Sequence, residues 1–288
     1  MASLVDLNPG PFVLLTQGSA SSPRPFLPPS RYSHHPHSPH QLQSRQQPLL
    51  SCLLTESNTW TVLQKIQEEM TALNADSDVK VIILTGAGRA FCSGVDLTAA
   101  QDVFKGDVKN REIDPVIQME ACTKPIIGAI NGFAVTAGFE IALACDILVA
   151  SKDAKFIDTH CKFGIFPSWG LSQKLPRIIG LNRAKEISWS AKPLDAITAE
   201  RWGLVNKVVE SREVLEAAIG VGEDIIKNQQ DMVVRYKGVI NDGFKLSLGD
   251  GAVLEKVSSM YSPLVGGVLE ASLHQDLGCE DGSKYMLM

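Results

Sequence analysis

The chain has 288 residues, of which 44% are hydrophobic, so it is long and apolar enough to bury a sizeable core. Its formal net charge of −5 argues against a general nucleic-acid-binding protein, because such proteins carry basic patches. No apolar run approaches the ~18 residues that a membrane-spanning helix needs, and the six cysteines show no CxxC spacing. We therefore expect neither nucleic acid, nor a membrane span, nor a bound metal.

The first 55 residues differ in composition from the rest of the chain. They include a stretch rich in Ser, Pro, His and Gln, and no acidic residue occurs between Asp6 and Glu56. Such a segment cannot bury enough apolar surface to fold alone, so we expect residues 1–55 to be disordered. Three interpretations remain open: an organelle transit peptide, an unstructured tail, or a mispredicted first exon.

Residues 56–256 show strand and helix patterns in alternation. Apolar residues at helical spacing predict a helix over about 63–73, and the pattern is mostly helical again from residue 171 onward. The expected strands are β-branched apolar runs at residues 79–84, 126–130 and 146–151. Strands that alternate with helices, followed by a helical C-terminal region, predict an α/β fold with helices packed outside the sheets.

Residues 257–288 form a divergent C-terminal segment, because several glycines interrupt the helical pattern there. The chain ends in Met-Leu-Met, which is not a peroxisomal address of the Ser-Lys-Leu type.

The first candidate loop reads AFCSGVD over residues 90–96. A strand leads into it, and Gly94 lets the chain turn sharply, which would leave the Val95 N–H facing a site. Ser93, Gly94 and Asp96 surround that amide as candidate substrate-binding positions. An ordinary strand-to-helix turn explains the same residues, because glycine-containing loops of this kind are common.

The second candidate loop precedes a helix that carries a carboxylate, Glu140, among apolar neighbours. A buried charge is unfavourable unless it is paired, hydrogen-bonded or used. Ala137 and Gly138 are small, so the backbone can approach a ligand and present free N–H groups. Amides from two loops would form an oxyanion hole beside a carboxylate that moves a proton. The alternative is a tight helix start that simply requires small residues.

His160 is the only histidine between residues 56 and 256. It becomes a partner for Glu140 only if the fold brings the two side chains together; otherwise it is a surface or core histidine. Two titratable groups of different type could then act as acid and base near neutral pH. Asp158 would orient the imidazole or cap a turn, and Trp169 is either a pocket wall or a core aromatic residue.

The chain resembles the crotonase superfamily, the enoyl-CoA hydratase/isomerase family, in three segments: GRAFCSGVDL, KPIIGAINGFAVTAGFEIALACDILVAS and FGIFPSWGLSQKLPRIIG. The resemblance covers about residues 60–256 and is strongest to plant peroxisomal enoyl-CoA hydratases. It implies a spiral of ββα units with two nearly perpendicular sheets and a helical C-terminal region. It also implies an acyl-CoA thioester substrate, no separate cofactor because CoA is part of the substrate, and a homotrimer or hexamer.

The resemblance also implies a role for each candidate residue. The N–H groups of Val95 and Ala137 map onto the pair that holds the thioester oxygen, and Glu140 maps onto the first of two catalytic glutamates. The second glutamate falls at His160, four residues after Phe156, which departs from the family's pattern. An imidazole can still orient water or carry a proton.

The function implied is hydration of 2-enoyl-CoA in fatty-acid beta-oxidation. A Δ3-Δ2 enoyl-CoA isomerase is an alternative, because one carboxylate suffices to move a proton. A truncated, non-catalytic subunit is another, because the strand pair that opens family chains is not visible before Thr59. The family resemblance favours the peroxisome, whereas the N-terminal composition favours a plastid or mitochondrion.

Overall fold

The computed structural model describes the backbone of residues 2–5, 12–17, 59–94 and 114–260, and the side chains of residues 66–94 and 114–260. The chain divides into two compact units, Met1–Val233 and Val234–Met288. None of the helices in the described ranges combines the length and the apolar character that crossing a bilayer requires.

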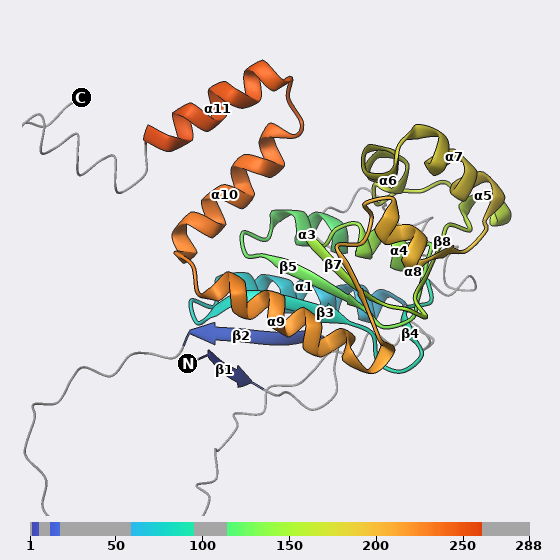
Figure 1. The fold of residues 1–288 in the computed structure, drawn as a ribbon, viewed down its shortest axis with the longest axis horizontal. Helices are drawn as coiled ribbons and strands as arrows, with labels where there is room; N and C mark the ends of the chain where they lie inside the picture. The colour runs from blue at the N-terminus through green and yellow to red at the C-terminus, as the bar shows by residue number, and fades with distance from the viewer. Residues whose placement is uncertain (1, 6–11, 18–58, 95–113, 261–288) are drawn as a thin grey trace, which may run out of the picture. The chain divides into compact units, whose positions relative to one another are not determined.

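Within the described residues, the larger sheet of the first unit has six strands in the order β1-β2-β3-β5-β7-β10 (Figure 1). Their bounds are β1 Ala2–Val5, β2 Phe12–Gln17, β3 Val79–Thr85, β5 Ile126–Ile130, β7 Ile147–Ser151 and β10 Lys207–Val209. The last four run parallel to one another, whereas β1 and β2 are an antiparallel pair whose second strand joins β3 in antiparallel register. The runs predicted at 79–84, 126–130 and 146–151 are therefore confirmed as adjacent strands.

The β1–β2 pair corrects one expectation. The sequence shows no clear strand pattern before Thr59, yet residues 2–5 and 12–17 extend the sheet beyond β3. β1 lies at the edge of the sheet and β2 pairs with both β1 and β3, so ladder hydrogen bonds stabilise these strands even where the local sequence pattern is weak. The expectation that the N-terminal strands are missing is wrong. Residues 18–58, which contain most of the Ser/Pro/His-rich segment, lie outside the described residues.

A smaller sheet has the order β4-β6-β8-β9, with the bounds Ala90–Cys92, Phe133–Val135, Lys155–Ile157 and Leu194–Asp195. β4, β6 and β8 are parallel, and β9 adds to β8 in antiparallel register. These strands have two or three residues each. Runs this short show no readable alternation, which is why the sequence pattern predicts only loops at residues 90–96 and 131–136.

Helices of the first unit alternate with the strands and follow them. They are α1 Thr59–Ala75, α3 Pro115–Ala121, α4 Ala137–Ala142, α5 His160–Phe163, α6 Leu171–Ile179, α7 Leu181–Ser190, α8 Ala196–Arg201, the 3-10 helix η1 Ser211–Glu213 and α9 Val214–Ile226. α10, Gln230–Gly243, begins at the end of this unit, and α11, Leu248–Met260, belongs to the second. The mostly helical character predicted from residue 171 onward is confirmed.

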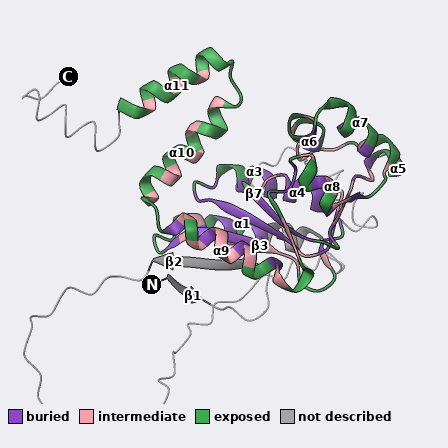
Figure 2. Cartoon of the chain, viewed as in Figure 1, coloured by how far each residue is buried: buried purple, intermediate pink, exposed green. Residues whose placement is uncertain are grey.

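The strands β3, β5 and β7 of the larger sheet are buried on both faces (Figure 2). Neighbouring residues of β3 point to opposite sides. Ile82 belongs to the main core together with Met70 of α1, whereas Val81 belongs to a second cluster together with Ala218 of α9. A strand covered on both faces reads as a continuous apolar run, which explains why these strands are visible in the sequence.

Candidate active site

The candidate site lies at the carboxyl ends of β4, β6 and β8. In the strand register, Cys92 is opposite Ala134, and Val135 is opposite Ile157. Because the three strands are parallel neighbours, the loops that follow them start at the same edge of the sheet. Those loops contain the candidates of three distant sequence segments, at residues 93–96, 136–140 and 158–160.

The first two loops come into close contact at two glycines. A Cβ atom built on Gly138 would lie 2.3 Å from the carbonyl oxygen of Cys92, so only glycine allows this approach. Gly94 has a φ of +98°, and a Cβ atom there would lie 3.3 Å from the carbonyl oxygen of Val135. The backbone at Gly94 therefore runs alongside the strand that leads to Ala137.

The remaining candidates of the first loop are only partly described. Ser93 is exposed and Gly94 is buried. Val95 and Asp96 lie outside the described residues, so the oxyanion amide expected at Val95 stays a prediction.

The second loop places Ala137 at the start of α4, whose six residues are all buried. The N–H groups in the first turn of a helix have no acceptor within the helix. Thr136, just before it, has a φ of 50° and a ψ of −103°, which residues other than glycine rarely adopt. Its N–H donates to the carbonyl oxygen of Ile157 at 2.8 Å, and its hydroxyl is hydrogen-bonded to that of Thr159. Both hydrogen bonds join the second loop, at Thr136, to the third segment, at residues 157–159.

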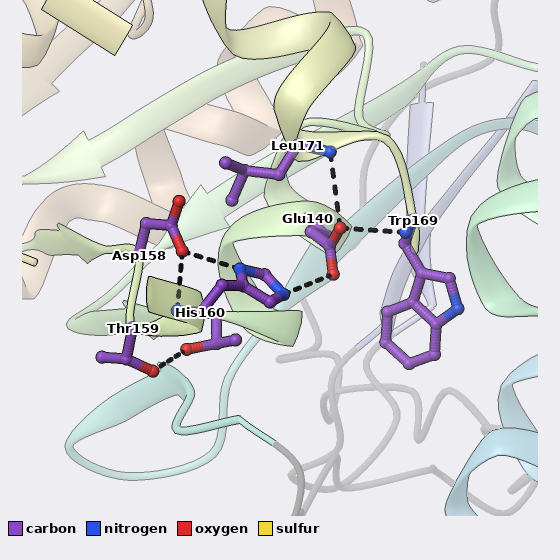
Figure 3. Close-up of polar contacts among 7 residues, drawn as sticks. Glu140, Asp158, Thr159, His160, Trp169 and Leu171 are labelled. Atoms are coloured by element: carbon purple, nitrogen blue, oxygen red, sulfur yellow. Dashed lines mark hydrogen bonds and ion pairs between the residues drawn. The ribbon is translucent and has the colours of Figure 1, made fainter. Parts of the chain in front are cut away.

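Glu140 is buried and directly hydrogen-bonded. One carboxylate oxygen, Oε1, accepts from the backbone N–H groups of Trp169 at 2.9 Å and Leu171 at 3.4 Å (Figure 3). The other oxygen, Oε2, lies 3.8 Å from Nε2 of His160. Burial raises the pKa of Glu140, and the proximity of His160 and the two backbone donors offset part of that rise. A carboxyl group with a raised pKa is suited to exchange a proton near neutral pH.

His160 lies between two carboxylates (Figure 3). Oδ1 of Asp158 accepts a hydrogen bond from the backbone N–H of His160 at 3.0 Å and lies 2.6 Å from Nδ1 of the ring. Burial alone would raise the pKa of Asp158, but hydrogen bonds from the side chains of His160 and Ser188 bring it below its ordinary value. Asp158 therefore contacts both the ring and the backbone N–H of His160 at the start of α5.

Trp169 contributes its backbone, not its ring, to the Glu140 carboxylate. Its indole is half-buried and points away from Glu140 (Figure 3). Gly170, with a φ of +94°, turns the chain between Trp169 and Leu171, so that both N–H groups reach one oxygen. The sequence gives no signal for Leu171 or for this role of Trp169, because every residue except proline has a backbone N–H.

The described part of the site combines a carboxyl group of raised pKa, an imidazole and the N–H groups of a helix start. Such a set can transfer protons next to a carbonyl group whose oxygen accepts a hydrogen bond from an amide. In the described ranges, no cluster of three or more His, Cys, Asp and Glu side chains has an arrangement that could hold a metal ion.

Residues 57–261 match the family model described as enoyl-CoA hydratase/isomerase. A protein of Arabidopsis thaliana, "Probable enoyl-CoA hydratase 1, peroxisomal", is 61% identical over 200 residues, which are 69% of this chain and 76% of that protein. The "Crotonyl-CoA hydratase" of Syntrophomonas wolfei is 34% identical over 199 residues, which are 67% of this chain and 76% of that protein.

The fold is also similar to solved structures. The crystal structure of enoyl-CoA hydratase from Bacillus anthracis superposes with a TM-score of 0.67 at 32% identity, over 76% of this chain and 86% of that one. That of the enoyl-CoA hydratase from Mycobacterium smegmatis superposes with a TM-score of 0.57 at 36% identity, over 69% and 85%. Both the family model and the structural likeness cover more than half of the chain. The chain has a crotonase fold and belongs to the enoyl-CoA hydratase/isomerase family.

Proposed function

We propose that this chain is an enoyl-CoA hydratase, a hydro-lyase that adds water across the 2,3 double bond of 2-enoyl-CoA in fatty-acid beta-oxidation. The family and the 61% identity to the Arabidopsis thaliana protein support this reaction class. The observation that carries the proposal is the meeting of two buried proton-transfer groups, Glu140 and His160, with 3.8 Å between Oε2 and Nε2. Glu140 lies about one helical turn after Ala137 in α4.

Hydration places the hydroxyl of water on Cβ and a proton on Cα. As the hydroxyl adds to Cβ, electron density shifts to the thioester oxygen, which becomes an enolate oxyanion before Cα is protonated. In our proposal the N–H of Ala137 donates to this oxygen, and the N–H of Val95 is the second donor. A preorganised donor stabilises the oxyanion more than the neutral carbonyl, so it lowers the barrier.

Glu140 and His160 divide the proton transfers between them. One accepts the proton that the attacking water loses, and the other gives a proton to Cα, so the product gains the atoms of one water molecule. The backbone donors at Trp169 and Leu171 hold Oε1 of Glu140 and leave Oε2 on the side of His160. We further propose that Ser93, Gly94, Asp96, Gly138 and Trp169 line the path of the acyl-CoA substrate.

A Δ3-Δ2 enoyl-CoA isomerase remains the second candidate function. The observation that favours it is that His160 replaces the second glutamate, because a single carboxylate can move a proton between two carbons. Product analysis with 2-enoyl-CoA and 3-enoyl-CoA substrates separates the two activities. The third alternative, a truncated non-catalytic subunit, was based on the absence of the N-terminal strands. It loses that support because β1 and β2 are present.

The deciding experiment is a crotonyl-CoA hydration assay on the purified full chain, alongside a Glu140→Gln variant. We expect hydration by the wild type and at least a ~100-fold lower rate for the variant, since a proton-transfer group contributes about 10²–10⁴-fold. Glu186→Gln is the matched control, because Glu186 lies on the exposed side of α7. An unchanged rate in Glu140→Gln would remove Glu140 from the mechanism, and an inactive wild type would reject the hydratase function.

We also propose a homotrimer or a hexamer built from two trimers. Exposed large apolar side chains on the C-terminal helices and in the turn between them support an oligomer, because exposed apolar patches are typical of interfaces. In the second unit they are Tyr236, Ile240, Phe244, Leu246, Leu248, Val253, Val257 and Met260. Sedimentation equilibrium of the full chain tests this, and a monomer at micromolar concentration would contradict it.

A further inference from the structure

We propose that Asp158 is a positioning residue that holds the imidazole of His160 in its Nδ1–H tautomer and directs Nε2 toward Glu140. This inference rests on the proposed hydratase function, which it extends by assigning a task to a third side chain. The three side chains form a line, Asp158–His160–Glu140, in which the ring has a carboxylate on each side (Figure 3).

The contacts of Asp158 determine which ring nitrogen carries the proton. One oxygen, Oδ1, receives both the backbone N–H and the side-chain Nδ1 of His160, at 3.0 and 2.6 Å. An ionised carboxylate can only accept hydrogen bonds, so Nδ1 must be the donor. In the neutral ring the other nitrogen, Nε2, then has a lone pair, and it is the only ring atom able to take up or release the reacting proton.

Burial leaves Asp158 and His160 few hydrogen-bond partners other than each other. Asp158 is 2% exposed and His160 is 4% exposed, so water is not a substitute partner for either group. Ser188 of α7 donates a second hydrogen bond to Asp158. The intervening residue, Thr159, is fastened through its hydroxyl to Thr136 at the start of α4. The segment is thus held from two sides, which restricts rotation of the ring.

The geometry on the Glu140 side leaves both reacting atoms usable. The 3.8 Å between Nε2 and Oε2 is longer than a hydrogen bond, so each atom can still form a hydrogen bond with another group. On its two sides, the ring faces Oδ1 of Asp158 through Nδ1 and Oε2 of Glu140 through Nε2. A glutamate at position 160 has two equivalent oxygens and needs no such partner, whereas a histidine has two unlike nitrogens that must be distinguished.

A purely structural role for Asp158 makes a different prediction. If the carboxylate only bonds the backbone at the start of α5, its loss would lower stability and leave the tautomer of His160 and the turnover rate of the folded protein unchanged.

The test uses Asp158→Asn in the full chain, with ¹⁵N-labelled histidine and crotonyl-CoA kinetics. The ¹⁵N shifts of His160, assigned by their loss in His160→Gln, should show Nδ1–H and unprotonated Nε2 in the neutral wild-type ring. In Asp158→Asn we expect a shift toward the other tautomer and a kcat about 10–100-fold lower, with KM within about 2-fold. Asp195→Asn is the matched control, because Asp195 also accepts from a backbone N–H, that of Thr198, outside this site; it should change neither quantity.

Each outcome decides the proposal. An Nε2–H ring in the wild type overturns the proposal without any variant. The proposal can therefore be rejected even if Asp158→Asn fails to fold. A kcat no lower than that of Asp195→Asn, or an unchanged tautomer in Asp158→Asn, also overturns it. A wild type that shows Nδ1–H but does not hydrate crotonyl-CoA rejects the proposed function and leaves the tautomer assignment standing.

Discussion

The two sheets of the first unit differ in what they bury. In the larger sheet, Ile82, Ile83 and Ile126 are completely buried among other apolar side chains. At the edge of the smaller sheet, the buried groups include Glu140 and His160, which are polar and ionisable.

The two kinds of buried group respond differently to substitution. An apolar core tolerates exchanges that keep its volume, because its contacts are not directional. A buried polar cluster requires every partner in place, because an unpaired donor or charge there is strongly unfavourable. We therefore expect substitutions in the larger sheet to act on the free energy of unfolding alone, and those at the smaller sheet's edge to act on the reaction rate as well as on stability.

The largest effect should come from changing the partner of Glu140. His160→Gln should lower kcat for crotonyl-CoA hydration by about 10²–10⁴-fold, because the amide cannot exchange a proton near neutral pH. His160→Glu introduces the residue that the family pattern has at this position, yet we expect it to be impaired as well. The new carboxylate would be buried next to the ionised Asp158.

A double variant sharpens this prediction. Combining His160→Glu with Asp158→Asn removes the repulsion, so it should recover activity relative to His160→Glu alone. Steady-state kinetics on the four proteins of this cycle measures the coupling. Additive effects would mean that the two side chains do not interact in the folded enzyme.

The next effect tests the other sheet. Ile83→Ala truncates a fully buried side chain of β3 in the cluster that also contains residues of α9. It should lower the free energy of unfolding by about 2–5 kcal/mol. Urea denaturation measures this loss. The kcat of the protein that remains folded should match the wild type, and a selective loss of kcat would contradict the division between the two sheets.

A pH-dependent effect follows from the raised pKa of Glu140. A group whose pKa is higher in the folded state binds protons more tightly there, so its contribution to stability falls as the pH rises through that pKa. Glu140→Gln keeps an oxygen for the N–H groups of Trp169 and Leu171 and cannot ionise. Its stability relative to the wild type should therefore be constant below the ordinary glutamate pKa and increase as the pH rises from that value through the raised pKa of the folded state.

Denaturation of both proteins between about pH 4 and pH 8 measures that difference, spanning the ordinary glutamate pKa of about 4.3. Glu186→Gln, on an exposed helix surface, should give a nearly flat difference. A difference that decreases with pH for Glu140→Gln would show that the folded protein stabilises the charged carboxylate.

The smallest effect concerns the backbone that joins the loops of the site. Thr136→Gly and Thr136→Ala both remove the hydroxyl that bonds Thr159, but only glycine readily adopts a φ of 50° with a ψ of −103°. We expect the glycine variant to be more stable than the alanine variant by about 1 kcal/mol or more. Equal thermal stabilities would mean that the backbone relaxes at this position.

The sequence by itself determined the strands and helices that have strong local patterns, together with the family and the buried charge at Glu140. β3, β5 and β7 are continuous apolar runs, and the helices α6 to α10 follow apolar periodicity, so local residues suffice to predict them. Three linked segments identified the family, because their order and separation together are far more specific than any one loop.

Only the tertiary structure decided which segments meet. The pairing of β4, β6 and β8 brings Gly94, Ala137 and Asp158 to one sheet edge, although each of these strands has only three residues. The β1–β2 pair and the backbone donors to Glu140 likewise depend on partners distant in the chain. The physical reason is that strand pairing and backbone hydrogen bonds use groups common to nearly all residues, so no side-chain pattern records them.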